Sequence, residues 1–217
     1  MVLKNLTNIR ERIKHAAERA GRSPEAIKLI VVTKEAALSQ VREVVASGVI
    51  DVGENRVKAA CLKKEVVDQH VLVWHMIGHL QTKKAKKAVD EFSLIHSIDN
   101  IKLLCAIDKC ARNSNKVQDV LIEVNVSGEK SKFGLSPEAL IAILEESKHL
   151  RHIKVLGLMT MAPFTDNAED TRPYFKKLKA LADKHRLKEL SMGMSQDFEV
   201  AIEEGATMVR IGSAIFK

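Results

Sequence analysis

Short runs of consecutive apolar residues, rich in β-branched side chains, alternate along this chain with longer segments of helical character. Strands that are buried on both faces of a parallel sheet are apolar at every position, and the connections between such strands are long enough to hold a helix. The pattern therefore predicts a parallel sheet with helices between its strands. The predicted strands are Leu29–Val32, Val49–Val52, Val71–Met76, Ser93–Ser97, Val120–Val126, Val155–Met161, Glu189–Met192 and Met208–Ile211.

Eight strand–helix units favour a closed (β/α)₈ TIM barrel over an open, doubly wound sheet, which gives a similar pattern. Between the strands, Ser136-Pro137-Glu138-Ala139 is typical of a helix start, and a helix is expected over Arg172–Lys184. The chain has 217 residues and contains no linker, repeat or low-complexity block, so we expect one domain over residues 1–217.

The charge balance is basic, with a formal net charge of +7. Such a balance suits anionic ligands without demanding them. The densest basic run, Lys83-Lys84-Ala85-Lys86-Lys87, has no aromatic residues among its lysines for bases to stack on. We interpret it as a solvated helix face rather than a nucleic-acid site.

Three cysteines, Cys61, Cys105 and Cys110, form no Cys-x-x-Cys pair, which argues against a disulfide framework or a zinc site and fits a reducing cytoplasm. Near the N-terminus, apolar residues at helical spacing predict an amphipathic helix rather than a signal peptide: Leu3, Leu6, Ile9, Ile13 and Ala17. No apolar stretch approaches the roughly 20 residues of a membrane span. No exposed apolar stripe indicates an obligate dimer, so we expect a monomer.

The ends of the last two predicted strands carry a candidate phosphate site. Ser195 follows the seventh strand, and Gly212-Ser213 follows the eighth, with Arg210 beside them. Hydroxyls and backbone amides at a glycine turn are donors that can converge on one phosphate. In a (β/α)₈ barrel, phosphate sites often lie after strands seven and eight.

Lys34 follows the first predicted strand, and we expect its amine to lie in the apolar mouth of the barrel. Loss of hydration there would lower the lysine pKa and make the neutral nucleophile available to an aldehyde. A ligand with an aldehyde, a phosphate and a ring nitrogen for Arg210 to face is pyridoxal 5′-phosphate. The alternative is a lysine that reaches out to solvent from a strand end.

Several motifs occur in order along the chain and resemble one known family. They are Val32-Thr33-Lys34, Gly53-Glu54-Asn55, Trp74 through Gln81, Asn125 through Gly134 with Ser131-Lys132, Gly157-Leu158-Met159, Ser191 through Ser195, and Val209 through Phe216. Together they resemble the pyridoxal-phosphate homeostasis protein family, also called the YggS or PROSC family, over nearly the whole chain.

The resemblance implies a barrel like the N-terminal domain of alanine racemase, with pyridoxal 5′-phosphate held as a Schiff base on Lys34. It further implies that Ser195, Gly212 and Ser213 hold the phosphate and that Arg210 faces the pyridine nitrogen. Asn55, His75 and Met159 would line the pocket, although His75 also fits a core histidine and Met159 a core methionine. Lys132 matches a lysine proposed in the family to take part in cofactor transfer.

The chain departs from the family pattern at three places. Asp51-Val52-Gly53-Glu54-Asn55 stands where the family usually has Phe-Gly-Glu-Asn, and Lys83 replaces an asparagine after Leu80-Gln81. The Gly-x-Arg tail that is common in relatives does not follow Phe216-Lys217. These differences concern the rim and the last helix rather than the predicted phosphate site.

Amino-acid racemisation on this cofactor requires a second acid or base on the far face of the substrate. The one tyrosine, Tyr174, falls on the predicted helix Arg172–Lys184, outside the barrel mouth. We therefore expect a protein that binds pyridoxal 5′-phosphate for its homeostasis without substrate turnover, and that contacts apo-enzymes transiently. The alternatives are a fold-type III racemase or decarboxylase and a sugar-phosphate barrel with an aldolase-type lysine.

Overall fold

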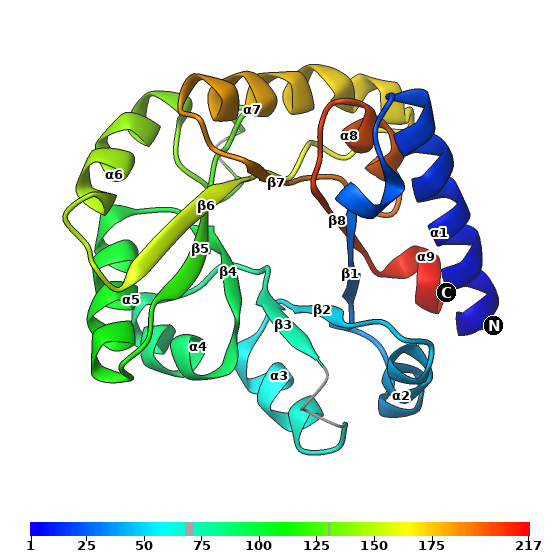
Figure 1. Ribbon diagram of the computed structural model, residues 1–217, viewed down its shortest axis with the longest axis horizontal. Coiled ribbons are helices and arrows are strands. Elements are labelled where there is room, and N and C mark those ends of the chain that lie inside the picture. Colours follow the sequence, from blue (N-terminus) through cyan, green and yellow to red (C-terminus); the bar gives the residue numbers. More distant parts are fainter. Residues whose placement is uncertain (68–71, 130) are drawn as a thin grey trace.

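The computed structural model describes residues 1–67, 72–129 and 131–217. Its strands are all parallel and close into a barrel in chain order, as Figure 1 shows. β1 pairs with β8 from Lys28 opposite Met208 to Val31 opposite Ile211. This pairing excludes the open sheet. The strands are β1 (Lys28–Val32), β2 (Asp51–Glu54), β3 (Val73–Met76), β4 (Leu94–Ile98), β5 (Gln118–Glu123), β6 (Ile153–Met159), β7 (Glu189–Ser191) and β8 (Met208–Ile211).

Each predicted strand has a counterpart, but several bounds differ. β8 has the predicted bounds, whereas β2 begins at Asp51 rather than at Val49. Val49 is buried although it lies in the loop that enters the strand, so an apolar run marks burial more reliably than it marks strand pairing. Val126 is likewise buried beyond the end of β5. β6 ends before Met161, which is partly buried against the small core inside the barrel. Val71, predicted to begin the third strand, lies outside the described residues.

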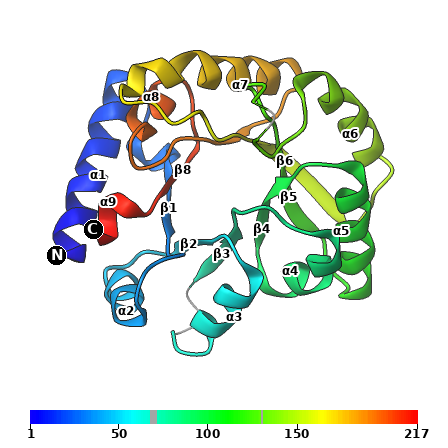
Figure 2. The same cartoon turned by 180° about the vertical axis from the view of Figure 1, so that it is seen from behind.

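Helices surround the strands in Figure 1 and in the opposite view of Figure 2. The predicted helix Arg172–Lys184 is confirmed with the same bounds, and the Oγ of Ser136 accepts a hydrogen bond from the amide of Ala139 at the predicted helix start. The α-helices are α1 (Val2–Arg19), α2 (Leu38–Ala46), α3 (Val57–Lys64), α4 (Ala85–Glu91), α5 (Ile101–Asn113), α6 (Leu140–Ser147), α7 (Arg172–Lys184), α8 (Phe198–Glu203) and α9 (Ser213–Phe216). Short 3₁₀ helices are η1 (Pro24–Ala26), η2 (Thr82–Lys84), η3 (Pro137–Ala139) and η4 (Ala168–Thr171).

Successive strand residues point alternately to two apolar cores. Val209 and Ile211 of β8 belong to the large core between strands and helices. Met208, from the same strand, belongs to a small core inside the barrel, together with Ile30, Leu94, Leu121 and Met159. By the same alternation, Arg210 faces the barrel interior.

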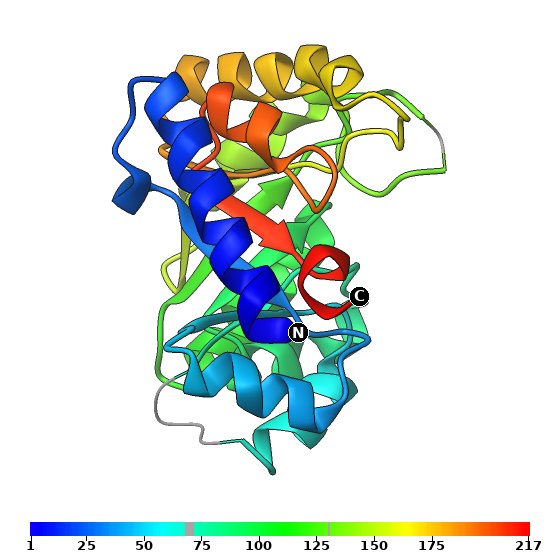
Figure 3. The ribbon, with the colours of Figure 1, turned by 90° about the vertical axis from the view of Figure 1, so that its right-hand side faces the viewer.

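The N-terminal helix α1 lies along α8 and α9, which Figure 3 shows side-on. Its buried face carries Leu6, Ile9, Ile13 and Ala17, as predicted, but Leu3 is exposed at the edge of that face. No helix in the described part of the chain is both long enough and apolar enough to span a bilayer.

Candidate functional site

The loop after β7 brings Ser195 to the start of α9. Gly193 has a φ of +90°, and a Cβ atom on it would lie 2.5 Å from the Cβ of Ala201, so glycine is required both by conformation and by space. Beyond this turn, the hydroxyl of Ser195 accepts a hydrogen bond from the amide of Ala214 at 3.3 Å. The structure thus brings Ser195 together with Gly212 and Ser213, which immediately precede Ala214.

The ends of β8 and β1 are also in contact. A Cβ atom on Gly212 would lie 3.0 Å from the carbonyl oxygen of Val32, the last residue of β1. Lys34 is two residues further along the chain, so it lies at the same end of the barrel as Gly212 and Ser213. The predicted lysine and the predicted phosphate donors therefore share the C-terminal mouth.

The surroundings of Lys34 differ from the apolar mouth that the sequence led us to expect. Lys34 lies in a turn beyond β1, its side chain is 47% exposed, and its Nζ is 3.9 Å from a carboxylate oxygen of Glu35. The expected desolvation was wrong for this conformation, because the turn carries the side chain to the rim of the barrel. The lysine keeps its predicted place in the chain but is solvated there.

A buried ion pair fixes the backbone immediately before Lys34. The hydroxyl of Thr33 donates to a carboxylate oxygen of Glu54 at 2.8 Å, and the amine of Lys63 contacts both that oxygen and the Thr33 carbonyl. Glu54 is fully buried and Lys63 is nearly so. Sequence reasoning singled out Glu54 only as part of a motif and did not consider Lys63, whose burial depends on the packing of α3.

Arg210 is buried in the barrel interior with two hydrogen-bond acceptors. Its Nη1 donates to the Oγ of Ser191 at 2.6 Å, and its Nη2 donates to the carbonyl of Thr160 at 2.9 Å. Burial lowers the pKa of Arg210 to about 10, against the opposing charges of Glu123 and Asp197. The guanidinium therefore remains charged at neutral pH.

His75 lies inside the barrel rather than at the C-terminal mouth. Its Nε2 is 2.9 Å from Oδ1 of Asp51, and its Nδ1 is 2.9 Å from Nε2 of His96. His75 also lines a cavity at the N-terminal end, together with Lys28 and Asp119. Its ring nitrogens contact His96 and Asp51, so the structure does not bring His75 together with Ser195 and Ser213.

Hydrogen bonds through Ser191 connect the two histidines to Arg210. Nδ1 of His96 is 2.8 Å from the Oγ of Ser191, the hydroxyl that also accepts from Arg210. Burial lowers the pKa of His75, although Asp51 opposes this, and burial holds the pKa of His96 well below its ordinary value. For Asp51, burial raises the pKa, but the bond and charge of His75 together with Lys28 outweigh it and leave the pKa lowered.

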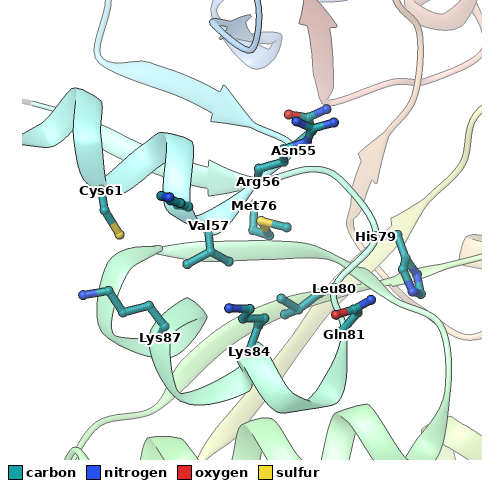
Figure 4. A pocket seen from close by; sticks show the side chains of 11 residues that line it. Asn55, Arg56, Val57, Cys61, Met76, His79, Leu80, Gln81, Lys84 and Lys87 are labelled. Carbon is teal, nitrogen blue, oxygen red and sulfur yellow. The ribbon is translucent and has the colours of Figure 1, made fainter.

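Met159, the last residue of β6, is fully buried in the small core inside the barrel. Asn55 follows β2 and is partly exposed. It lines a cavity of about 510 Å³ between the start of α3 and α4, where Figure 4 shows Lys84 and Lys87 across from Asn55 and Arg56. The exposed Lys84 and Lys87 form part of the solvated basic face expected from the sequence.

Glu123 is an acidic residue that sequence reasoning missed. It ends β5, is 2% exposed, and its Oε2 has no hydrogen-bond partner among the described residues. Burial raises the pKa of Glu123 to about 7, with Asp99 adding to this effect and Arg210 opposing it. Its position two residues after the interior-facing Leu121 was the available signal.

Lys132 lies in the loop after β5, with its amine 3.7 Å from a carboxylate oxygen of Glu129. Its side chain is 22% exposed. Residue 130, within the motif that runs from Asn125 to Gly134, lies outside the described residues. The structure places Lys132 beside the barrel mouth without bringing it into hydrogen-bond contact with the predicted site residues.

The chain matches known proteins over nearly its whole length. Residues 5–217 match the family model described as the alanine racemase N-terminal domain. The pyridoxal phosphate homeostasis protein of Aquifex aeolicus is 48% identical over an alignment of 217 positions, which covers 97% of this chain and 95% of that protein.

Solved structures of other proteins have the same fold as this chain. PipY of Synechococcus elongatus with PLP bound has a TM-score of 0.89 and 32% identity, with complete coverage of both chains. Alanine racemase of Clostridium difficile shares the fold, with a TM-score of 0.75 and 17% identity over 99% of this chain and 56% of that one. This chain belongs to the alanine racemase N-terminal domain family and, within it, to the pyridoxal phosphate homeostasis proteins.

Proposed function

We propose that this protein binds pyridoxal 5′-phosphate and serves in its homeostasis, without turning over a substrate. The observation that carries the proposal is the parallel pairing of β1 with β8, which puts Lys34 and the Gly212-Ser213 turn at one end of the barrel. PipY, a relative that matches this chain from end to end, is described with PLP bound. We assign the function to a single domain over residues 1–217.

The cradle between β7 and α9 fits a phosphate group by its donors. Ser195 and Ser213 supply hydroxyls, and the backbone amides around Gly212 supply further donors at a turn. Gly212 lies so close to Val32 that a side chain at this position would crowd the end of β1. Because Gly212 has no side chain, a phosphate group can approach the backbone amides and the two hydroxyls of this turn closely.

Lys34 and Arg210 would bind the remainder of the cofactor. When bound, pyridoxal 5′-phosphate supplies an aldehyde that combines with amines and a ring that withdraws electrons. Lys34, exposed at the rim, has the amine that would hold the aldehyde covalently. Arg210 carries only donors, so it would hold the ring nitrogen without a proton and limit electron withdrawal by the ring. Asn55 and Met159 would approach the ring from the ends of β2 and β6.

The case for binding without turnover rests on where acids and bases are placed. Tyr174 lies on α7, on the outer layer of the fold, rather than at the mouth. Racemisation needs a positioned acid on the face opposite the base, which typically contributes about 10²–10⁴-fold.

The proposed partners are the cofactor and, transiently, apo-enzymes that require it. We place the function in the cytoplasm, where Cys61, Cys105 and Cys110 stay reduced.

One observation favours the second candidate, a single-domain fold-type III racemase or decarboxylase. Glu123 is buried inside the barrel with one unpartnered carboxylate oxygen, and its pKa of about 7 suits general acid–base catalysis. Arg210 and Glu123 are both buried, with 3% and 2% exposure, and each shifts the pKa of the other. In this alternative, Glu123 and Lys34 would have to serve the two faces of the substrate.

The experiment that tests binding is visible absorbance of the protein after incubation with pyridoxal 5′-phosphate and exhaustive dialysis. We expect a retained absorbance band and about one cofactor per chain. Pyridoxal without phosphate serves as the matched ligand and should be lost on dialysis. Absence of retained cofactor, or equal retention of both compounds, would contradict the proposal.

A further inference from the structure

A continuous hydrogen-bonded chain crosses the barrel interior from β8 to β2. It runs from Arg210 through Ser191, His96 and His75 to Asp51, over separations of 2.6, 2.8, 2.9 and 2.9 Å. Four of its five members are 3% exposed or less, and Asp51 is partly buried. Asp51 begins β2, so the chain reaches from the C-terminal half of the barrel to its N-terminal end.

The position of each proton along this hydrogen-bonded chain follows from the chemistry of its two end residues, Asp51 and Arg210. Asp51 is ionised and can only accept, so Nε2 of His75 carries a hydrogen and donates to it. Burial keeps His75 neutral, which leaves its Nδ1 as an acceptor for the Nε2 hydrogen of His96. His96 is also neutral, so its Nδ1 accepts from the hydroxyl of Ser191.

At the other end, Arg210 can only donate, and it donates to the Ser191 oxygen. All four hydrogen bonds therefore point the same way, from the guanidinium to the carboxylate. Bonds aligned in this manner polarise one another, and the opposite charges at the two ends favour this single arrangement. The direction of each bond is fixed by chemistry at both ends.

We propose that Ser191, His96, His75 and Asp51 are positioning residues that hold the Arg210 guanidinium in one orientation at the binding site. Asp51, whose Oδ1 also lies 3.4 Å from the amine of Lys28, is the anionic end of this chain, while Glu123 and Asp197 act on Arg210 from the other side. The functional part rests on the proposed function, because it assigns Arg210 to the ring nitrogen of the cofactor. The arrangement of protons and the orientation of Arg210 do not depend on that assignment.

Nuclear magnetic resonance of the ligand-free protein tests the chain itself. Long-range ¹H–¹⁵N spectra at neutral pH should show His75 and His96 as neutral rings protonated at Nε2. The Arg210 side chain should give separate Nη proton signals in the wild type, because its rotation is hindered, and merged signals in Ser191→Ala. A charged ring, a ring protonated at Nδ1, or an unchanged Arg210 in Ser191→Ala would overturn the inference.

Measurements of cofactor binding test whether the hydrogen-bonded chain affects the binding site through Arg210. Asp51→Asn keeps the size of the side chain and one oxygen that can accept from Nε2 of His75, but removes the charge. Asp119→Asn is its matched control, because Asp119 lines the same N-terminal cavity without belonging to the hydrogen-bonded chain. Asp51→Asn should shift the pH midpoint of the bound cofactor's visible absorbance, and Ser191→Ala should weaken cofactor binding by about tenfold. Asp119→Asn should match the wild type in both measurements.

The outcomes separate the two proposals. If the wild type retains no pyridoxal 5′-phosphate, the proposed function fails. The nuclear magnetic resonance experiment still shows whether the hydrogen-bonded chain exists and holds Arg210. If the wild type binds the cofactor and Asp51→Asn and Ser191→Ala bind and absorb as it does, the positioning role fails and the proposed function stands. A shift in Asp119→Asn equal to that in Asp51→Asn would show a general charge effect and overturn the inference.

Discussion

The hydroxyl of Ser195 lies 3.3 Å from the amide nitrogen of Ala214, from which it accepts a hydrogen bond. This contact joins the loop after β7 to the first turn of α9, although the two residues are nineteen positions apart in the sequence. It brings a hydroxyl to the Gly212-Ser213 turn, where the proposed phosphate site depends on donors from two separate strand ends.

Removing both hydroxyls from this cradle should weaken phosphate binding. A charge-assisted hydrogen bond contributes about 1.5–3 kcal/mol, so each serine-to-alanine change should reduce affinity for pyridoxal 5′-phosphate by roughly ten- to a hundredfold. Equilibrium dialysis of Ser195→Ala, Ser213→Ala and the double variant measures this. Unchanged retention in the double variant would remove the assignment.

The turn before Ser195 should tolerate no side chain. Gly193→Ala would place a Cβ atom 2.5 Å from that of Ala201, in a backbone of φ +90°. The matched control is Gly48→Ala, where φ is +78° and nothing lies within 4 Å of the added atom. We expect the control to cost about 1 kcal/mol of unfolding free energy and Gly193→Ala about 1–3 kcal/mol more.

Urea denaturation measures this difference, and cofactor dialysis shows its effect on the cradle. Gly193→Ala should lose affinity because the loop that carries Ser195 must move, whereas Gly48→Ala should bind normally. Equal unfolding free energies for the two variants would show that the space around Gly193 is not restrictive.

Much of the architecture could be predicted from the sequence because buried parallel strands leave continuous apolar runs. The positions of Ser195, Gly212 and Ser213 after the last two strands also indicated that these residues lie at one end of the barrel. The pairing of His75 with His96 could not be foreseen, since it depends on the register between β3 and β4. The exposure of Lys34 was missed for a related reason: the alternation of a strand does not extend into the turn that follows it.

Glu123 should make stability depend on pH. Its pKa is about 7 in the folded protein and near 4.3 in an unfolded chain, so the folded state binds the extra proton between these values. Stability attributable to Glu123 is therefore present below about pH 4 and is lost as pH rises through 7. The full effect is on the order of 3 kcal/mol.

Glu123→Gln removes this titration. The variant should exceed the wild type in unfolding free energy at pH 8, and the advantage should shrink steadily towards pH 5. Denaturant titrations across this range measure the difference, with Glu129→Gln as the exposed control. A difference that does not change with pH would refute the elevated pKa.

The protein should not exchange or invert the α-proton of amino acids. Incubation of the cofactor-loaded protein with L-alanine and other L-amino acids in deuterium oxide, followed by mass and chirality analysis, measures both events. We expect exchange at the background rate of free pyridoxal 5′-phosphate. Rapid exchange with inversion that disappears in Lys34→Ala and in Glu123→Gln would instead establish the fold-type III enzyme.

The lysine that holds the cofactor can be identified by covalent trapping. Borohydride reduction of the loaded protein, followed by proteolysis and mass spectrometry, fixes the pyridoxyl group on the amine to which it was bound. A Schiff base on Lys34 predicts this added mass on the peptide that contains Lys34, and its absence from that peptide in Lys34→Ala. Labelling confined to Lys132 or to any other lysine in the wild type would contradict it.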